Sequence, residues 1–400
     1  MPRAADSKSA RSAVGQVPVA QAATAGCGCD GSFEEKMLEE IVAATYWFEA
    51  EARGKPYSMA VFFKGHRVGL AGKLQSHDRF EQVETVGGIV PGSGPVSVTA
   101  RVHGVSAGEW IVTAEPLARN GRGQLDRPQS GASAGGLRGL KRTFWPWLRH
   151  PLSSGITSPV RTRLTPFVSV PASIPAAWWG LVAPGVVFGL ALQAMLVARA
   201  HVDVRATLTV SLTALSFGFM GAKVWFLAVH RGNAGSTVFT EGLCIQGFIA
   251  GAAASAAALL ALFHLPAGTF LDATAPGLLV GMAIGRPGCF LTGCCAGRPT
   301  ASRWGVFASD RRVGMRRIPI QLWESLACLA IGLAALFLVL NYRPPMPGAV
   351  FVGAIATYTL CRQFLLPLRA EPRKSSIGPR LTIVVAALVL VADIVLAATD

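Results

Sequence analysis

Seven long apolar runs follow residue 174, and they constrain the fold of this chain more than any other feature. The runs lie at residues 176–198, 206–229, 241–263, 275–295, 319–340, 348–367 and 381–398. Each approaches the ~20 residues that a helix needs to cross the hydrocarbon core of a bilayer. Only 15% of the chain is charged, whereas a soluble domain has about 25% charged residues. A single soluble globule is therefore excluded, and residues 175–400 predict an α-helical polytopic membrane domain with about seven transmembrane helices.

Before the membrane domain, apolar residues lie in shorter segments. Residues 33–52 place apolar residues at helical intervals behind an acidic first turn, which predicts a helix. Short β-prone segments follow, separated by Gly, Pro and Ser, at 57–63, 67–72, 79–86, 95–103 and 109–116. The alternating segments 96–102 and 109–117 predict a hairpin. Residues 32–117 therefore predict a small, soluble β-sandwich-like domain, which is either a partner-binding module or a passive accessory domain.

The flanks of this domain are polar. Residues 1–31 are expected to be disordered, and residues 118–174 are expected to form a Gly-, Pro- and Ser-rich linker. Nine basic residues and one acid lie between Arg119 and Arg163, a composition attracted to anionic headgroups. The whole chain has a net charge of +15, which phospholipid contact explains beside a membrane domain, so no nucleic-acid partner is expected.

Ionisable side chains within the apolar runs indicate where chemistry takes place, because a charge in hydrocarbon is costly. Arg286 lies inside its run, in the sequence GRPGCFLTGCCAGR (285–298), and Arg298 ends that sequence. The Pro and Gly residues between them predict a broken helix, whose free N–H groups and two guanidinium groups suit a phosphate. Arg362 lies near the end of its run and is expected to snorkel to the interface.

A basic loop follows and leads into IPIQLWES (318–325). Gln321 and Glu324 are three residues apart, so they share one face of the next helix. The Glu324 carboxylate is either a general base or the ion-pair partner of Arg316 or Arg317. No metal site is predicted, because the nearby cysteines have neither a fourth ligand nor a neighbouring His. These cysteines are Cys289, Cys294 and Cys295.

Residues 285–307 and 316–324 together resemble the bacterial prolipoprotein diacylglyceryl transferases, and IQGFIAG (245–251) resembles that family's His-Gly-Gly-Leu element. The matching positions are Gly285, Arg286, Gly288, Phe290, Gly293, Gly297, Arg298, Thr300, Trp304, Pro319, Gln321, Leu322 and Glu324. The resemblance covers residues 175–398 and implies a seven-helix, multi-pass protein of the bacterial plasma membrane. Positive charge in the short loops favours a cytoplasmic arginine loop, whereas the resemblance implies the outer face, so the orientation stays open.

Several polar family residues are replaced in this chain. Gln246 stands in place of the family's His, and Cys289 in place of an Asn. The other replacements are Phe248, Thr292, Cys294, Ile318 and Trp323. The anion-binding positions thus remain, while most groups suited to proton transfer do not.

The resemblance implies transfer of diacylglyceryl from phosphatidylglycerol to the Cys thiol of a lipoprotein-precursor peptide, without a cofactor. The implied phospholipid-binding residues are Arg286, Arg298, Arg317, Gln321, Gly285 and Gly288, and the implied catalytic residues are Glu324, Glu241 and Gln246. Glycine-rich helices around 247–251 and 277–285 are expected to leave a lateral opening for the lipid. The alternative is a catalytically divergent phospholipid-binding relative whose N-terminal domain binds a partner.

Overall fold

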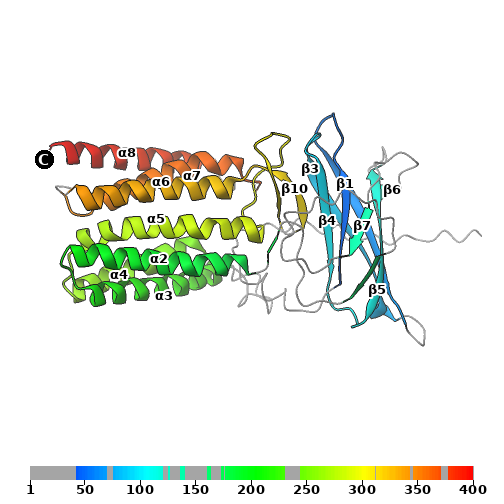
Figure 1. Ribbon diagram of the computed structural model, residues 1–400, viewed down its shortest axis with the longest axis horizontal. Helices are drawn as coiled ribbons and strands as arrows, with labels where there is room; N and C mark the ends of the chain where they lie inside the picture. Colours follow the sequence, from blue (N-terminus) through cyan, green and yellow to red (C-terminus); the bar gives the residue numbers. More distant parts are fainter. Residues whose placement is uncertain are drawn as a thin grey trace, which may run out of the picture.

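The computed structural model describes two connected parts, a β domain and a bundle of helices that extends from it (Figure 1). The described residues are 42–69, 75–119, 125–126, 136–139, 160–163, 173–174, 176–229, 244–310, 312–342, 346–370 and 377–399. The disorder expected for residues 1–31 falls outside this part of the chain.

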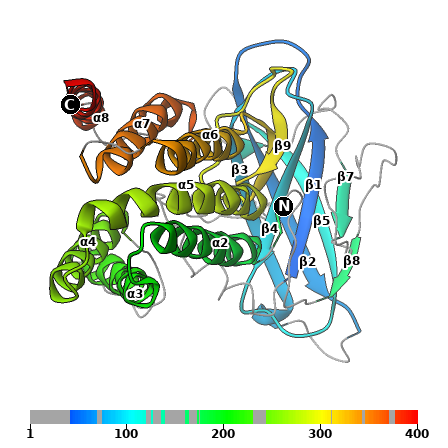
Figure 2. The ribbon, with the colours of Figure 1, turned by 60° about the vertical axis from the view of Figure 1, so that its left-hand side comes forward.

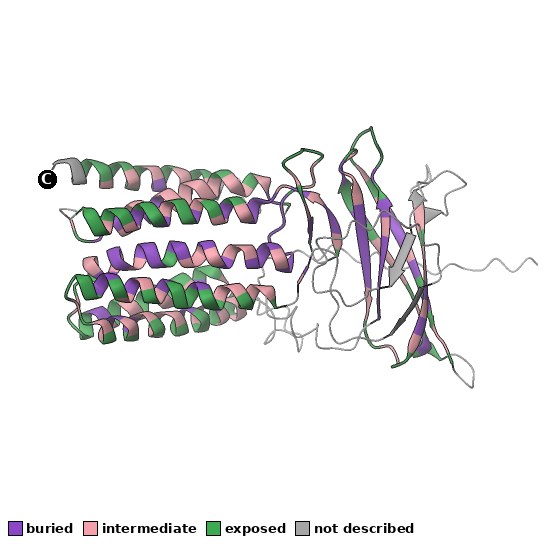
Figure 3. Ribbon diagram, in the orientation of Figure 1, coloured by how far each residue is buried: buried purple, intermediate pink, exposed green. Residues whose placement is uncertain are grey.

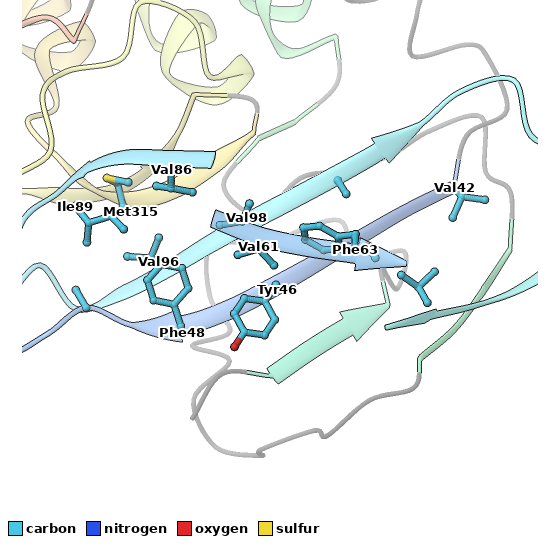
Figure 4. Packing of buried hydrophobic residues seen from close by; sticks show 14 of the residues in the cluster. Val42, Tyr46, Phe48, Val61, Phe63, Val86, Ile89, Val96, Val98 and Met315 are labelled. Atoms are coloured by element: carbon cyan, nitrogen blue, oxygen red, sulfur yellow. The ribbon is translucent and has the colours of Figure 1, made fainter. Parts of the chain in front are cut away.

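The β domain is a sandwich of two antiparallel sheets. Its strands are β1 (Val42–Glu49), β2 (Tyr57–Arg67), β3 (Arg79–Ile89), β4 (Pro95–Val102), β5 (Glu109–Arg119), β6 (Leu125–Asp126), β7 (Gly136–Gly139), β8 (Val160–Arg163), β9 (Val306–Ser309) and β10 (Val313–Arg317). One sheet has the order β7-β1-β4-β10-β9 and the other has β3-β2-β5-β6, with β8 also paired to β5. Inward-facing side chains of both sheets form one core, and Figure 4 shows Met315 of β10 beside Val86 and Ile89 of β3.

Two local predictions for this domain are wrong. Residues 42–49, expected to be helical, form β1, which pairs with β4 on one side and β7 on the other. Nearly every residue of β1 is buried, so the strand lacks the polar alternation that distinguishes it from a helix. The segments expected to form a hairpin are β4 and β5, and they belong to different sheets. The loop between them crosses the sandwich instead of closing a turn.

The segment expected to be a linker supplies short strands to both sheets. Within residues 118–174, β7 pairs with β1, while β6 and β8 pair with β5. Residues 125–126, 136–139 and 160–163 of this segment therefore extend the sandwich.

Seven helices long and apolar enough to cross a membrane follow in the described residues, which confirms the predicted membrane domain. They are α2 (Ala177–Arg199), α3 (Val204–Val229), α4 (Ile245–Leu262), α5 (Ala267–Thr292), α6 (Ile320–Asn341), α7 (Ala349–Leu365) and α8 (Ile377–Thr399). Figure 3 shows that α5 is buried along most of its length, while the other helices expose much of their apolar surface. The α5 helix is thus the centre of the bundle, and the exposed apolar faces meet lipid.

Glycines bring pairs of helices into backbone contact. A Cβ at Gly185 or Gly189 of α2 would lie 2.6 Å from the carbonyl oxygen of Gly281 or Gly277 of α5, respectively. Gly221 of α3 contacts Gly247 of α4 in the same way. The prediction of a lateral opening around 277–285 is therefore wrong, because these glycines allow α2 and α5 to pack closely.

An apolar groove of about 420 Å³ does lie beside the other glycine-rich segment, between α3 and α4. Its lining includes Phe217 of α3 and Gly251, Ser255 and Leu259 of α4. Gly247 and Gly251 themselves pack closely against α3, so the groove borders the α3–α4 contact, and an opening for the lipid at residues 247–251 stays a prediction.

The loop between α5 and α6 joins the two parts of the molecule. Its hairpin, β9 and β10, completes the first sheet of the sandwich at β4, as Figure 2 shows. The chain leaves the β domain through α2 and returns to it after α5, and four membrane crossings bring a chain back to its starting face. The β domain and the arginine-rich loop therefore lie on the same side of the membrane.

Candidate active site

The end of α5 forms one wall of the candidate site. Pro287 lies within the helix, which continues to Thr292 and ends at Gly293 with a left-handed φ of 76°. Cys295, two residues on, also has a positive φ of 54°. The expected helix break between 285 and 298 is thus confirmed, and it lies about two turns after Arg286.

Three arginines converge on the buried carboxylate of Glu324, in the first turns of α6. Arg286 Nη2 lies 2.9 Å and Arg362 Nη1 2.6 Å from Glu324 Oε1, while Arg369 Nη2 lies 3.4 Å from Oε2. The Tyr358 hydroxyl donates to Oε1 over 3.3 Å and accepts from Arg286 and Arg362 over 3.0 and 3.1 Å. Only 3% of the Glu324 side chain is exposed. Glu324, Arg286, Arg362, Arg369 and Tyr358 together form the Glu324 cluster.

Sequence reasoning missed three members of this cluster. The expectation that Arg362 snorkels to the interface is wrong, because its guanidinium group is bound to Glu324. Tyr358 and Arg362 are four residues apart on α7, so they share a face, and this polar pair in an apolar helix is the signal that could have identified them. Arg369 follows α7 in the chain, and its place is set by tertiary contacts that no local pattern records.

The other predicted arginines reach this network indirectly. Arg298 is exposed, and its Nε donates to the backbone carbonyl of Arg369 over 3.2 Å. Arg317 is buried, with Nη2 2.6 Å from Asp310 Oδ2 and Nη1 3.3 Å from the Gly297 carbonyl. Neither Arg316 nor Arg317 is among the ion-pair partners recorded for Glu324 in the described residues. Arg286 and Arg298 thus contact different members of one network.

The remaining predicted residues have varied surroundings. Gln321 is buried and donates from Nε2 to the Cys294 carbonyl over 2.9 Å, which ties α6 to the end of α5. Gly285 and Gly288 face α2, where a Cβ at Gly288 would lie 3.1 Å from the Ala177 carbonyl oxygen. Gln246 is exposed at the start of α4, and its Oε1 accepts from the Cys244 thiol over 2.7 Å. Glu241 lies outside the described residues.

The three cysteines near the end of α5 pack together. Cys289, Cys294 and Cys295 are buried in one small apolar cluster, with Trp178 of α2 against it. Within the described part of the chain, no group of three or more His, Cys, Asp or Glu side chains is arranged to hold a metal ion.

Seven apolar helices in the described residues, with three arginines around the buried Glu324 carboxylate at one end of the bundle, define a polytopic membrane protein. A family model described as prolipoprotein diacylglyceryl transferase matches residues 167–399, more than half of the chain. The chain belongs to this family, and it is a multi-pass transferase of a bacterial cell membrane.

Individual relatives agree with this assignment. The phosphatidylglycerol–prolipoprotein diacylglyceryl transferase of Dehalococcoides mccartyi is 30% identical over 200 residues, which are 48% of this chain and 76% of the relative. The enzyme of that name numbered 2 in Streptomyces coelicolor is 33% identical over 188 residues, 43% of this chain and 59% of the relative. The corresponding Nostoc enzyme is 26% identical over 215 residues, 50% of this chain and 76% of the relative.

Proposed function

We propose that this chain transfers diacylglyceryl from phosphatidylglycerol to the Cys thiol of a lipoprotein-precursor peptide at the Glu324 cluster. The observation that supports the proposal most is the charge of the cluster. Among its described members, three guanidinium groups face one carboxylate, and all lie at the end of a membrane-embedded bundle. An excess of buried positive charge is unfavourable unless an anion compensates it.

The phosphate of the lipid headgroup is the anion proposed for this place. Guanidinium groups bind phosphate oxygens through paired, charge-assisted hydrogen bonds. Arg286 would bind it from α5, and Arg362 and Arg369 would bind it from the α7 side. Glu324 and the Tyr358 hydroxyl orient these groups before the lipid arrives, because they already accept their hydrogen bonds. A preoriented site needs little reorganisation in the transition state.

The proposed reaction forms one carbon–sulfur bond and breaks one carbon–oxygen bond. The precursor thiol loses its proton, and the thiolate sulfur attacks the glyceryl carbon that carries the phosphate. The bonding electrons leave with the phosphate oxygen, so the products are a thioether and glycerol phosphate. The arginines stabilise the negative charge that develops on this oxygen.

Glu324 is the proposed acceptor of the thiol proton. Its Oε1 accepts hydrogen bonds from Arg362 and Tyr358 and forms an ion pair with Arg286, whereas among the described residues Oε2 is bound by Arg369 at 3.4 Å. Oε2 is therefore the oxygen with capacity for a further proton. Catalytic roles for Glu241 and Gln246 stay predictions, and Gln246 would orient a substrate oxygen, since an amide is not a base at neutral pH.

A secondary phospholipid contact is proposed for Arg298, and a supporting role in phospholipid binding is proposed for Arg317 and Gln321. Arg298 is exposed beside Arg369, which suits a second contact with the headgroup. Arg317 and Gln321 hold the backbone on which Arg298 lies, through the Gly297 and Cys294 carbonyls. A lipid contact by Gly285 and Gly288 stays a prediction beside their packing against α2. The absence of a nucleic-acid partner is likewise a prediction.

The test is rescue of lipoprotein modification in cells depleted of their own transferase. The wild-type chain is expected to restore modification, and Arg286→Ala is expected to lower the transfer rate by roughly 100-fold or more. Arg286→Lys should not restore it, because an ammonium group lacks the planar fork. Arg199→Ala, which removes an exposed arginine at the other end of α2, is the matched control and should transfer normally.

Failure of the wild-type chain to rescue, at normal membrane abundance, would contradict the proposal. Saturable binding to phosphatidylglycerol vesicles in that case would favour the alternative, a divergent lipid-binding relative. The replacements at Gln246 and Cys289 are the observations in favour of this alternative.

A further inference from the structure

A continuous series of backbone contacts runs from the N-terminal β domain to the Glu324 cluster. The Thr99 N–H of β4 donates to the Arg312 carbonyl over 2.9 Å, and Gly314 of β10 is paired with Ser97. At the other end of β10, the Thr300 N–H donates to the Arg316 carbonyl over 3.0 Å. The series then continues to the segment after α7.

That second part reaches Arg369. The Ile318 N–H donates to the Arg298 carbonyl over 3.1 Å, and the Arg298 N–H donates to the Leu368 carbonyl over 2.8 Å. The Ala370 N–H donates to the Ala296 carbonyl over 2.9 Å. Arg369, held between these bonds, is bound to Glu324. Arg298, Arg317 and Arg369 therefore lie on backbone that this series of contacts fixes, whereas Arg362 lies on α7.

Side chains hold the loop hairpin against the β domain on both faces of the sheet. On the inner face, Met315 of β10 is 1% exposed in the core of the sandwich. On the other face, the rings of Trp47 and Phe307 stack with centroids 5.6 Å apart. Trp47 pairs with Ser97 across β1 and β4, and Ser97 pairs with Gly314. A Cβ at Gly314 would lie 2.8 Å from the Phe307 ring, so small residues make room for the two rings to meet.

The matched family region begins at residue 167, so Trp47 and β4 lie outside it while Phe307 and β10 lie inside it. We propose that the N-terminal β domain positions the arginine loop of the transferase, through the β4–β10 pairing and the Trp47–Phe307 contact. This inference rests on the proposed function, because it assigns the loop arginines to the lipid phosphate. Trp47 and Phe307 are positioning residues, since they act on the lipid only through the backbone that carries Arg298, Arg317 and Arg369.

The test uses the full chain in nanodiscs and the variants Trp47→Ala and Phe307→Ala. Two quantities are measured, hydrogen exchange of the amides of residues 306–317 and the transfer rate against phosphatidylglycerol concentration. Each variant is expected to speed exchange and to raise the KM for phosphatidylglycerol roughly tenfold, the scale of an aromatic contact. The kcat should change less, because the arginines bind phosphate in both ground and transition states.

A matched control and a double variant make the test specific. Phe80 of β3 is another half-buried aromatic residue, and its ring lies 5.8 Å from that of Trp110 within the β domain. Phe80→Ala should leave the KM unchanged. The double variant Trp47→Ala/Phe307→Ala should have the KM of either single variant, because both break one contact.

Three results would overturn the inference. They are an equal rise of KM in Phe80→Ala, additive effects in the double variant, and faster loop exchange without any change in KM. If the wild-type chain transfers no lipid, the proposed function fails, and the exchange data still decide whether Trp47 holds the loop. Unchanged exchange in Trp47→Ala would then overturn that part as well, whereas faster exchange confined to residues 306–317 would support it.

Discussion

The β domain and the helical bundle bury opposite kinds of residue. In the β domain, large side chains such as Trp110 and Phe63 are fully buried. In the bundle, glycines of α2 and α5 meet at the helix contact, while Phe337 of α6 is 64% exposed. Water drives large apolar side chains into a core, whereas hydrocarbon gives them no reason to leave the surface. The same residue type therefore stabilises the fold in one region and contacts lipid in the other.

The two regions also differ in where they place charge. Lys64 and Glu81 of the β domain form an ion pair of 3.0 Å at the surface, with about 60% of each side chain exposed. The Glu324 cluster lies buried, where an ion pair is a costly way to stabilise a fold. The buried charges of the Glu324 cluster thus indicate function, while the exposed Lys64–Glu81 pair does not.

The largest expected effect comes from truncating a core aromatic residue. Phe63→Ala should destabilise the β domain by about 3–5 kcal/mol, through lost burial and a cavity. Phe337→Ala removes the same atoms from the lipid-facing surface of α6 and should cost no more than about 0.5 kcal/mol. Hydrogen exchange of the full chain in nanodiscs measures both. An equal loss of stability in the two variants would contradict the claim that large apolar side chains stabilise the β domain but not the lipid-facing surface of the bundle.

Adding a side chain to a helix contact should have the next largest effect. Gly189→Val places two methyl groups against the backbone of Gly277, and overpacking of this kind costs roughly 1–3 kcal/mol. Gly180 lies in the same helix with nothing within 4 Å of its Cβ position, so Gly180→Val is the control. Thermal unfolding in detergent compares the two variants. An equal loss in both would mean that helix propensity, rather than the contact, sets the cost.

Most of the fold was predictable because its signals are local. A run of apolar residues specifies a transmembrane helix by its length alone, and all seven such runs are helices. The failure at residues 42–49 has a physical cause, since a strand buried on both faces loses its period of two. The participation of residues 306–317 in the sheet was not predictable, because β10 pairs with a strand more than 200 positions earlier in the chain.

The candidate site was predictable only in part. Arg286 and Glu324 were identified because each interrupts an apolar run, and they form an ion pair. Arg286 and Arg298 were expected to bind one phosphate together, and whether they can do so depends on the path of the chain after Gly293. Two left-handed residues set that path, and it places Arg298 beside the Arg369 carbonyl rather than beside Glu324.

A third prediction compares a buried helix cap with an exposed one. Asp272 of α5 is 8% exposed and accepts from the N–H groups of Gly348 and Phe351, over 2.7 and 3.1 Å, at the start of α7. Asp272→Ala should cost about 2 kcal/mol, the upper range for a cap, because it leaves buried donors unpaired. It should also lower transfer, since α7 carries Tyr358 and Arg362.

Asp203 provides the matched control for this cap. It is exposed, and its Oδ1 accepts from the N–H groups of Arg205 and Ala206 at the start of α3. Asp203→Ala should cost about 0.5–1 kcal/mol, because water can replace the lost acceptor. Thermal unfolding and transfer rates are measured together. If Asp203→Ala lowered the transfer rate as much as Asp272→Ala, the loss of transfer would not arise from a shift of α7, and the prediction would be wrong.

The smallest expected effect depends on pH and belongs to the β domain. Burial of the Asp78 carboxyl opposes its ionisation, but hydrogen bonds from the Gln75 N–H and from Arg67, each 3.2 Å long, outweigh burial and lower its pKa. Because the folded pKa is the lower one, this contribution to stability is complete above about pH 4, the ordinary pKa of an Asp. It is lost as the pH falls through the folded pKa.

Asp78→Asn should therefore reduce the loss of β-domain protection between pH 6 and pH 3, as measured by hydrogen exchange of β2 and β5 with exchange rates corrected for pH. Glu81→Gln, which removes an exposed carboxylate from the Lys64 pair, should leave that loss unchanged. A full acid-induced loss in Asp78→Asn would assign acid sensitivity to other carboxylates. In that case the hydrogen bonds of Asp78 would hold the turn before β3, but their contribution to stability would not depend on pH.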